Sequence, residues 1–143
     1  SVASRGLGDV YKRQNMMFYK NKIALIDSQD AVLGNPAYDL ASLIDDVRIK
    51  TSNSFKSNIL KVFLSKFKYK NESQFINDFE ILSVLRNLKI IGIFTRLAKR
   101  DKKRKYLKLI PYAWKLIDNR IKNNLNFRDL KNFLQKNPRI KKI

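Results

Sequence analysis

The chain has 143 residues, and its 44% hydrophobic content, with nine phenylalanines, is enough for the core of one domain. It contains no cysteine and no histidine, which excludes disulfides, thiolate nucleophiles, the usual zinc sites and a histidine base. The formal net charge of +19 is compatible with nucleic acid or an anionic membrane as partner, but we favour a compositional bias toward A- and T-rich codons, because lysine, asparagine and isoleucine are all abundant.

Residues 1–14 are set apart by the stretch from Ser4 to Gln14, which resembles the translation of a transposon-end adapter. The part from Asp9 to Gln14 would be encoded by GAT GTG TAT AAG AGA CAG, the end of such an adapter. Cloning segments are excluded from reasoning about the fold. We therefore expect residues 1–14 to be an assembly artefact and the natural chain to begin at or near Asn15. A real loop over residues 4–14 is the alternative.

A β-hairpin is predicted next. Two short apolar runs, residues 16–19 and 23–26, flank Lys20-Asn21-Lys22, and asparagine tolerates the left-handed conformation of a tight turn. The two ends of this hairpin carry Asn15 and Asp27 side by side. Residues 30–37, with Gly34 and Pro36, are predicted to form a loop.

Three helices follow, because the hydrophobic period changes from 2 to 3.6. The first is predicted around residues 40–47, the second over 54–68 and the third over 73–99. The third is apolar almost all round between Ile90 and Phe94, which predicts burial on most sides, and Gly92 there predicts the close approach of another helix. The residues expected on the inner faces of the first two helices are Leu40, Leu43, Ile44, Val47, Phe55, Ile59, Phe63 and Phe67.

The C-terminal third begins with the mainly basic segment Lys99–Lys105, which is predicted to be a solvated loop. Pro111 suits the first turn of a helix that carries Trp114 and Ile117. A last short helix is predicted over residues 127–134, before a frayed basic tail over 137–143. The predicted fold is therefore mainly α, with one short β-hairpin followed by about five helices.

The residues that could carry chemistry are an amide and three carboxylates. Asn15 and Asp27, at the two ends of the hairpin, offer the oxygen ligands that Mg²⁺ prefers. Alternatively, Asp27 begins a turn and Asn15 only flanks a strand, and spacing alone favours this second interpretation. Asp39 precedes a helical run as an N-cap or a first-turn acid. Asp30 contacts a substrate or a water near the metal, or it caps the loop.

The runs Ile26–Ala31 (IDSQDA) and Gly34–Ala41 (GNPAYDLA) resemble the C-terminal lobe of the aminoglycoside phosphotransferase family. The resemblance continues from Asn15 to about Leu134, so a lobe is expected over residues 15–136. One departure is Ser28, where relatives more often carry an aromatic residue. Four further segments are similar to the branch that phosphorylates the anomeric hydroxyl of N-acetylmuramate and N-acetylglucosamine: residues 79–82, 85–97, 100–101 and 106–111.

The resemblance implies a protein-kinase-like C-terminal lobe that uses ATP and Mg²⁺ to phosphorylate a sugar hydroxyl. It makes Asn15 and Asp27 the metal ligands and Asp39 a structural acid that braces the catalytic loop. The family's catalytic aspartate falls five residues before Asn15, at Val10, and Asp9 is one position out of register. We therefore expect this chain to be inactive by itself, without that aspartate and the N-terminal lobe that holds the nucleotide.

Two other functions stay open. A basic helical module could bind nucleic acid through Lys99–Lys105 and Lys141–Lys142, and an inactive pseudokinase could act as a scaffold. The Asp27–Ala41 segment would be unexplained in a nucleic-acid-binding module. No run of about 18 apolar residues is present, so we predict no membrane span and a cytoplasmic location.

Overall fold

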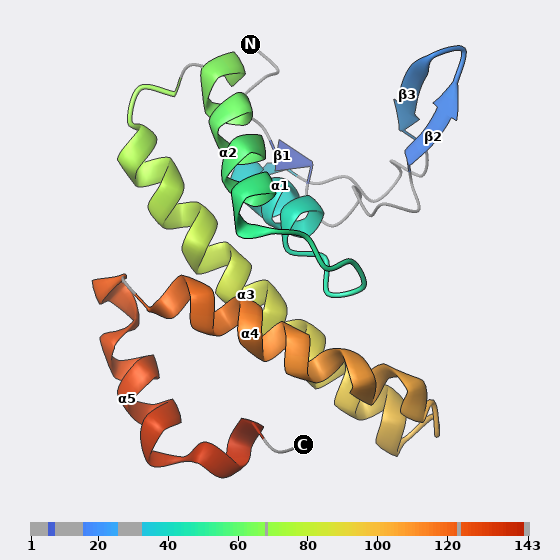
Figure 1. The fold of residues 1–143 in the computed structure, drawn as a ribbon, viewed down its shortest axis with the longest axis vertical. Helices are drawn as coiled ribbons and strands as arrows, with labels where there is room; N and C mark the ends of the chain where they lie inside the picture. The colour runs from blue at the N-terminus through green and yellow to red at the C-terminus, as the bar shows by residue number, and fades with distance from the viewer. Residues whose placement is uncertain (1–5, 8–15, 26–32, 68, 123, 142–143) are drawn as a thin grey trace. The chain divides into compact units, whose positions relative to one another are not determined.

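The computed structural model describes residues 6–7, 16–25, 33–67, 69–122 and 124–141 (Figure 1). The chain divides into two compact units. Unit 1 comprises residues 1–46 and 50–79, and unit 2 comprises residues 47–49 and 80–143. The described part is mainly helical, which confirms the predicted fold class.

The predicted hairpin is confirmed. Strands β2 (Met16–Tyr19) and β3 (Lys22–Leu25) pair antiparallel, with Met16 opposite Leu25 and Tyr19 opposite Lys22. Lys20 and Asn21 form the turn with φ angles of 46° and 58°, the left-handed pair of a two-residue hairpin loop. The second strand begins and ends one residue earlier than predicted. Several large apolar side chains of the hairpin are exposed, including Phe18 on β2 and Ile23 on β3.

A second, shorter strand pair joins β1 (Gly6–Leu7) to β4 (Leu33–Gly34), with Gly6 opposite Gly34 and Leu7 opposite Leu33. The sequence pattern did not predict this pair. Residues 6 and 7 lie in the stretch that resembles an adapter, and β4 lies in the segment predicted to be a loop.

Helix α1 (Pro36–Ile44) begins four residues before the predicted helix. Pro36 fixes the first turn, because its ring presets the helical φ angle and its missing N–H needs no partner there. The buried face consists of Ala37, Leu40, Ala41 and Ile44. Leu43 was expected on that face but is 45% exposed. The helix instead buries the side that carries Ala37 and Ala41, and position 43 lies outside that side.

Helix α2 (Asn53–Phe67) has its buried face one residue away from the predicted one. Lys56 and Leu64 are buried, while Phe55 and Phe67, expected inside, are 52% and 43% exposed. Phe63, on the predicted face, is half-buried and joins an aromatic cluster. The ring centroids of Phe63, Tyr69 and Phe75 lie 4.3–6.1 Å apart, which ties the end of α2 to the first turn of α3 (Glu72–Lys99).

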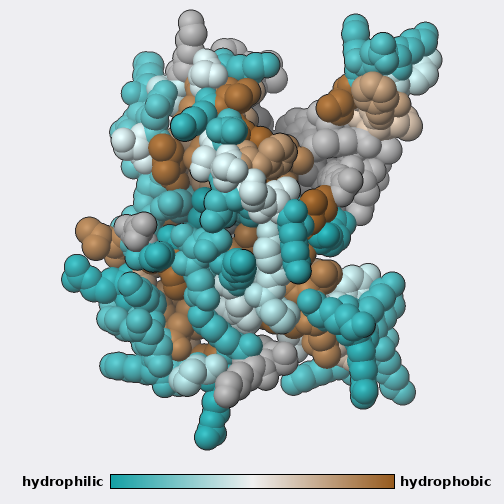
Figure 2. Space-filling view, in the orientation of Figure 1, coloured by the Kyte–Doolittle hydropathy of each residue, from teal (hydrophilic) through white to brown (hydrophobic). Residues whose placement is uncertain are grey.

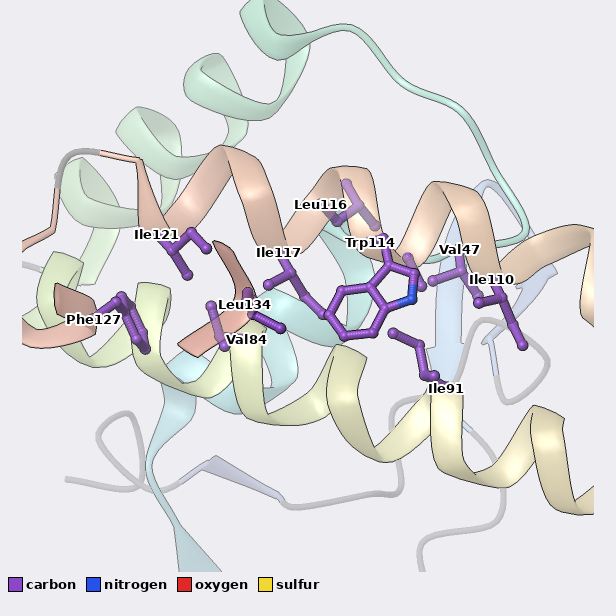
Figure 3. Close-up of a cluster of buried hydrophobic side chains, with 11 residues drawn as sticks. Val47, Val84, Ile91, Ile110, Trp114, Leu116, Ile117, Ile121, Phe127 and Leu134 are labelled. Carbon is purple, nitrogen blue, oxygen red and sulfur yellow. The ribbon is translucent and has the colours of Figure 1, made fainter. Parts of the chain in front are cut away.

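Unit 2 is built on α3 from residue 80 onward and on α4 (Ile110–Ile121), which lie side by side. Figure 3 shows the buried side chains of Val84 and Ile91 from α3 meeting those of Trp114 and Ile117 from α4. Shorter elements complete the unit: η4 (Arg104–Leu109), η5 (Leu125–Phe127), α5 (Arg128–Lys136) and η6 (Pro138–Lys141). Residues 138–141, expected to fray, form this last 3₁₀ turn.

The prediction that residues 90–94 are buried on most sides is wrong. Ile91 is buried, but Ile90 and Phe94 are only half-buried and Gly92 is exposed. A Cβ atom built on Gly92 would meet nothing within 4 Å, so no described helix approaches it closely. Leu85, an apolar residue of the same helix, is 55% exposed. Packing against one partner helix, α4, uses only one side of α3 in unit 2.

Helix α3 ends at Lys99, as predicted, in a tight backbone turn. The Arg100 N–H donates to the carbonyl of Arg96, and the Lys103 N–H donates to that of Leu97 at 3.0 Å. This turn places Lys102 at φ 54°, a left-handed conformation that costs a residue with a Cβ atom about 1–2 kcal/mol. None of the described helices combines the length and the apolar character that a membrane span requires.

Candidate functional site

The two predicted metal ligands, Asn15 and Asp27, lie outside the described residues, as do Asp30 and Val10. Asn15 directly precedes β2, and Asp27 lies two positions after β3 in sequence. Their role as a metal pair therefore stays a prediction. Among the described residues, no three carboxylate, histidine or cysteine side chains gather into a possible metal site.

The described part of the site region is the junction between β4 and α1. Asn35 is the N-cap of α1, and its Oδ1 accepts a hydrogen bond of 3.0 Å from the Ala37 N–H. Its Nδ2 donates to Oδ2 of Asp78, on α3, at 2.7 Å. Gln74 donates to the other oxygen of Asp78, also at 2.7 Å. Asn35 thus accepts a hydrogen bond from one of the free N–H groups at the N-terminus of α1. It also links this helix end to the first part of α3 within unit 1.

Asp39 lies in the first turn of α1 and is half-buried. Of its two predicted local roles, the N-cap role is wrong because Asn35 occupies that position, and the first-turn role is confirmed. A carboxylate there interacts favourably with the positive end of the helix dipole. Whether Asp39 also braces a catalytic loop stays a prediction.

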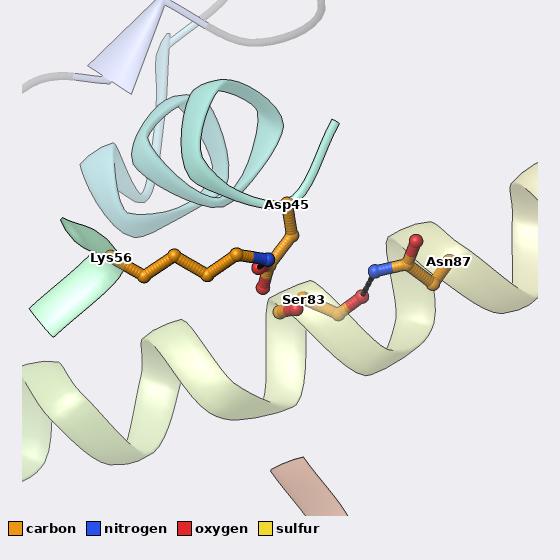
Figure 4. Close-up of polar contacts among 4 residues, drawn as sticks. All are labelled: Asp45, Lys56, Ser83 and Asn87. Carbon is orange, nitrogen blue, oxygen red and sulfur yellow. Dashed lines mark hydrogen bonds and ion pairs between the residues drawn. The ribbon is translucent and has the colours of Figure 1, made fainter. Parts of the chain in front are cut away.

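A buried ion pair, which the sequence analysis missed, links α1 to α2. Figure 4 shows the Lys56 ammonium reaching the Asp45 carboxylate, with 2.8 Å between Nζ and Oδ1. The relative exposures of the two side chains are 7% and 0%. Asp45 also closes α1, since its N–H donates to the carbonyl of Ala41 at 2.9 Å. A buried lysine requires such a partner, because an isolated charge in the interior is very costly.

Figure 4 also shows a second polar contact, which lies in unit 2. The Asn87 Nδ2 donates to the carbonyl oxygen of Ser83 at 2.9 Å, one turn earlier on α3. Both residues are fully buried. The Asn87 Oδ1 has no hydrogen-bond partner within the part of the chain that the structure describes.

Replacing Asn35 by alanine is expected to lower the free energy of unfolding by about 1 kcal/mol, the usual cost of losing an N-cap side chain. Denaturant unfolding followed by circular dichroism measures this change. Asn58→Ala is the matched control, because Asn58 is exposed within α2 and alanine favours a helix there. Equal stability of the Asn35 and Asn58 variants would show that the cap contributes nothing.

The chain is similar to one protein family and to several curated proteins. Residues 7–71 match the model of the phosphotransferase enzyme family. An N-acetylmuramate/N-acetylglucosamine kinase of Caulobacter vibrioides is 34% identical over 97 residues, which cover 68% of this chain and 27% of the relative. The kinase of the same name from Neisseria meningitidis is 34% identical over 104 residues, 68% of this chain and 31% of the relative.

A third relative with this name, from Pseudomonas aeruginosa, is 26% identical over 114 residues, 76% of this chain and 34% of the relative. The chain therefore spans about a third or less of the length of these curated relatives. The family match includes Asp27, Asn35, Asp39 and the Asp45–Lys56 pair, whereas the matches to the relatives extend beyond it.

Proposed function

Because this chain belongs to the phosphotransferase enzyme family, we propose that it is the C-terminal part of an ATP- and magnesium-dependent kinase that acts on an amino sugar. The observation that carries the proposal is the family match over residues 7–71, which contains both candidate metal ligands. The shared name of the three relatives supports an amino sugar as acceptor.

The proposed reaction transfers the γ-phosphoryl group of ATP to a sugar hydroxyl, and such catalysis depends on positioning and charge stabilisation. An amide and a carboxylate oxygen fit Mg²⁺, which takes one or two protein ligands and fills its shell with water and phosphate. Asn15 and Asp27 supply those groups. When bound, the metal neutralises charge on the phosphates. Asn35, through its contacts to Ala37 and Asp78, fixes the start of α1, which follows these residues in the sequence.

The acceptor in this proposal is a neutral or anionic sugar, such as N-acetylglucosamine or N-acetylmuramate, with its anomeric hydroxyl as the nucleophile. A polycationic aminoglycoside needs an acidic pocket, and this chain has 12 acidic residues against 31 lysines and arginines. Strong phosphorylation of kanamycin-like amines by the full-length protein, without turnover of the two amino sugars, would contradict this choice of acceptor.

The chain as it stands is expected to show no detectable phosphoryl transfer, because Val10 occupies the position expected for the aspartate that orients or deprotonates the acceptor hydroxyl. The check is a radiolabelled-ATP assay with both amino sugars. Long-read sequencing of the source DNA upstream of the Asn15 codon is the companion experiment. We expect the adapter-like codons to be absent and an aspartate codon five positions before Asn15. Activity of the 143-residue chain would overturn this proposal.

A second candidate function is nucleic-acid binding by the basic segments. Binding measurements distinguish it from the kinase proposal. A kinase should bind ATP in a Mg²⁺-dependent manner once its full length is restored. A nucleic-acid-binding module should bind RNA or DNA with an affinity that falls steeply as salt increases.

A further inference from the structure

The end of α3 carries a cavity to which the proposed function assigns no role. It lies within unit 2 and has a volume of about 830 Å³. Figure 2 shows hydrophilic side chains projecting from the end of α3, around a few hydrophobic ones. The cavity is lined by Thr95, Ala98, Lys99, Lys102, Arg104 and Leu107.

Three of these lining side chains are cations without a counter-charge. Lys99, Lys102 and Arg104 make no side-chain hydrogen bond or ion pair with any residue that the structure describes. The carboxylate in this segment, that of Asp101, is engaged by Arg100, with 2.7 Å between Nε and Oδ1. This hydrogen bond lowers the pKa of Asp101 below its usual value. The three cavity cations therefore lack an anion.

The helix dipole accounts for only part of this pattern. A cation in the last turn of a helix, such as Lys99, complements the negative helix end. Lys102 and Arg104 lie beyond the helix, and Lys102 has a left-handed φ angle of 54°. The turn thus holds a lysine at the cavity in a backbone conformation that glycine or asparagine adopts at lower cost.

A hydroxyl group adds a second, independent observation. The Oγ1 atom of Thr95 is buried at this cavity and has no hydrogen-bond partner among the described residues. In a helix, a threonine hydroxyl commonly bonds to a carbonyl of the preceding turn. The ring centroids of Phe94 and Tyr106 lie 5.2 Å apart, so η4 packs against α3 beside this cavity.

We infer that this cavity binds the phosphate group of a small phosphorylated molecule. Three cations and a hydroxyl suit a doubly charged oxyanion, because charge-assisted hydrogen bonds are the strong ones. The cavity is much larger than a phosphate ion, and its Ala98 and Leu107 walls give the rest of the ligand an apolar surface. The inference is independent of the kinase proposal, since neither ATP nor Mg²⁺ is involved.

The test is isothermal titration of the full chain with glucose 6-phosphate, with glucose as the uncharged control ligand. Glucose 6-phosphate should bind and glucose should not. The double variant Lys99→Gln/Lys102→Asn should bind at least about tenfold more weakly. Asparagine suits the left-handed position 102, so this variant should fold, and its circular dichroism spectrum checks that it does.

The matched control is Lys61→Gln/Lys115→Gln, which removes the same charge from exposed positions on α2 and α4. Its affinity should stay within about twofold of the unsubstituted chain, because neither lysine lines the cavity and exposed charges are screened by salt. Thr95→Val should weaken binding without any change in net charge.

Three results would overturn the inference. The first is no binding of glucose 6-phosphate, and the second is equal weakening by the two double variants, which would mean a response to overall charge. The third is a short single-stranded oligonucleotide that displaces glucose 6-phosphate and binds with a steep salt dependence, which would make this a nucleic-acid surface. None of these results depends on whether the chain transfers phosphate from ATP.

Discussion

Replacing Asp45 by alanine is expected to lower the free energy of unfolding by about 3–5 kcal/mol, the usual cost of removing one partner of a buried ion pair. The substitution leaves the Lys56 ammonium in an interior where the relative exposure of its side chain is 7%. It also removes the contact that holds the end of α1 against α2. Urea unfolding followed by far-ultraviolet circular dichroism measures the change as a lower midpoint.

Two further variants make this prediction specific. Asp118→Ala breaks an exposed ion pair with Lys141, so a loss of only about 0–1 kcal/mol is expected. Asp45→Asn/Lys56→Met removes both buried charges and should recover much of the stability, because a buried pair can often be replaced without loss. Equal, small losses of unfolding free energy for Asp45→Ala and Asp118→Ala would contradict this prediction. They would show that removing Asp45 carries no large desolvation cost for the buried Lys56 ammonium.

The second large effect is expected at Asp27. In the full-length protein encoded by the source DNA, Asp27→Ala should lower kcat by about 10³-fold, or about 4 kcal/mol of transition-state stabilisation. The physical reason is that a metal held by one ligand instead of two neutralises the phosphates less well. Kinetics with N-acetylglucosamine over a range of Mg²⁺ concentrations test this.

Comparison with two other aspartates identifies the cause. Asp129→Ala removes an exposed first-turn acid of α5 and should leave kcat unchanged. Asp30→Ala separates its two predicted roles, because a substrate contact changes KM and a loop cap does not. If Asp27→Ala kept full activity with the same Mg²⁺ requirement, the assignment of Asp27 as a metal ligand would be rejected.

Hydrophobic periodicity predicted most elements of this fold well, but it placed several side chains of α1, α2 and α3 inside that are exposed. The hairpin with its turn at Asn21, the long helix to Lys99 and the helix that carries Trp114 are all present. On α2, periodicity selected Phe55 as buried, whereas the neighbouring Lys56 is inside. A residue scale assigns lysine to the surface because it does not include a partner that another helix supplies.

The sequence could predict only those features of the candidate site that depend on residues close together in the chain. Asn35 before Pro36 is a local N-cap signal, although it was overlooked in favour of Asp39. The contact of Asn35 with Asp78 joins residues 43 positions apart, which no periodicity can show. For Asp45, a signal was available: the carboxylate comes one position after the buried Ile44, at the end of an apolar stripe, and a charge there needs a partner.

The position of Trp114 gives the chain an internal optical reporter. It is the single tryptophan of the sequence, and it is buried in the core of unit 2, where the Lys141 ammonium lies 5.7 Å from the ring centroid. Tryptophan emission therefore follows the melting of unit 2, whereas the secondary-structure signal follows both units. Coincident curves mean that the units melt as one cooperative body, and separate curves assign a stability to each.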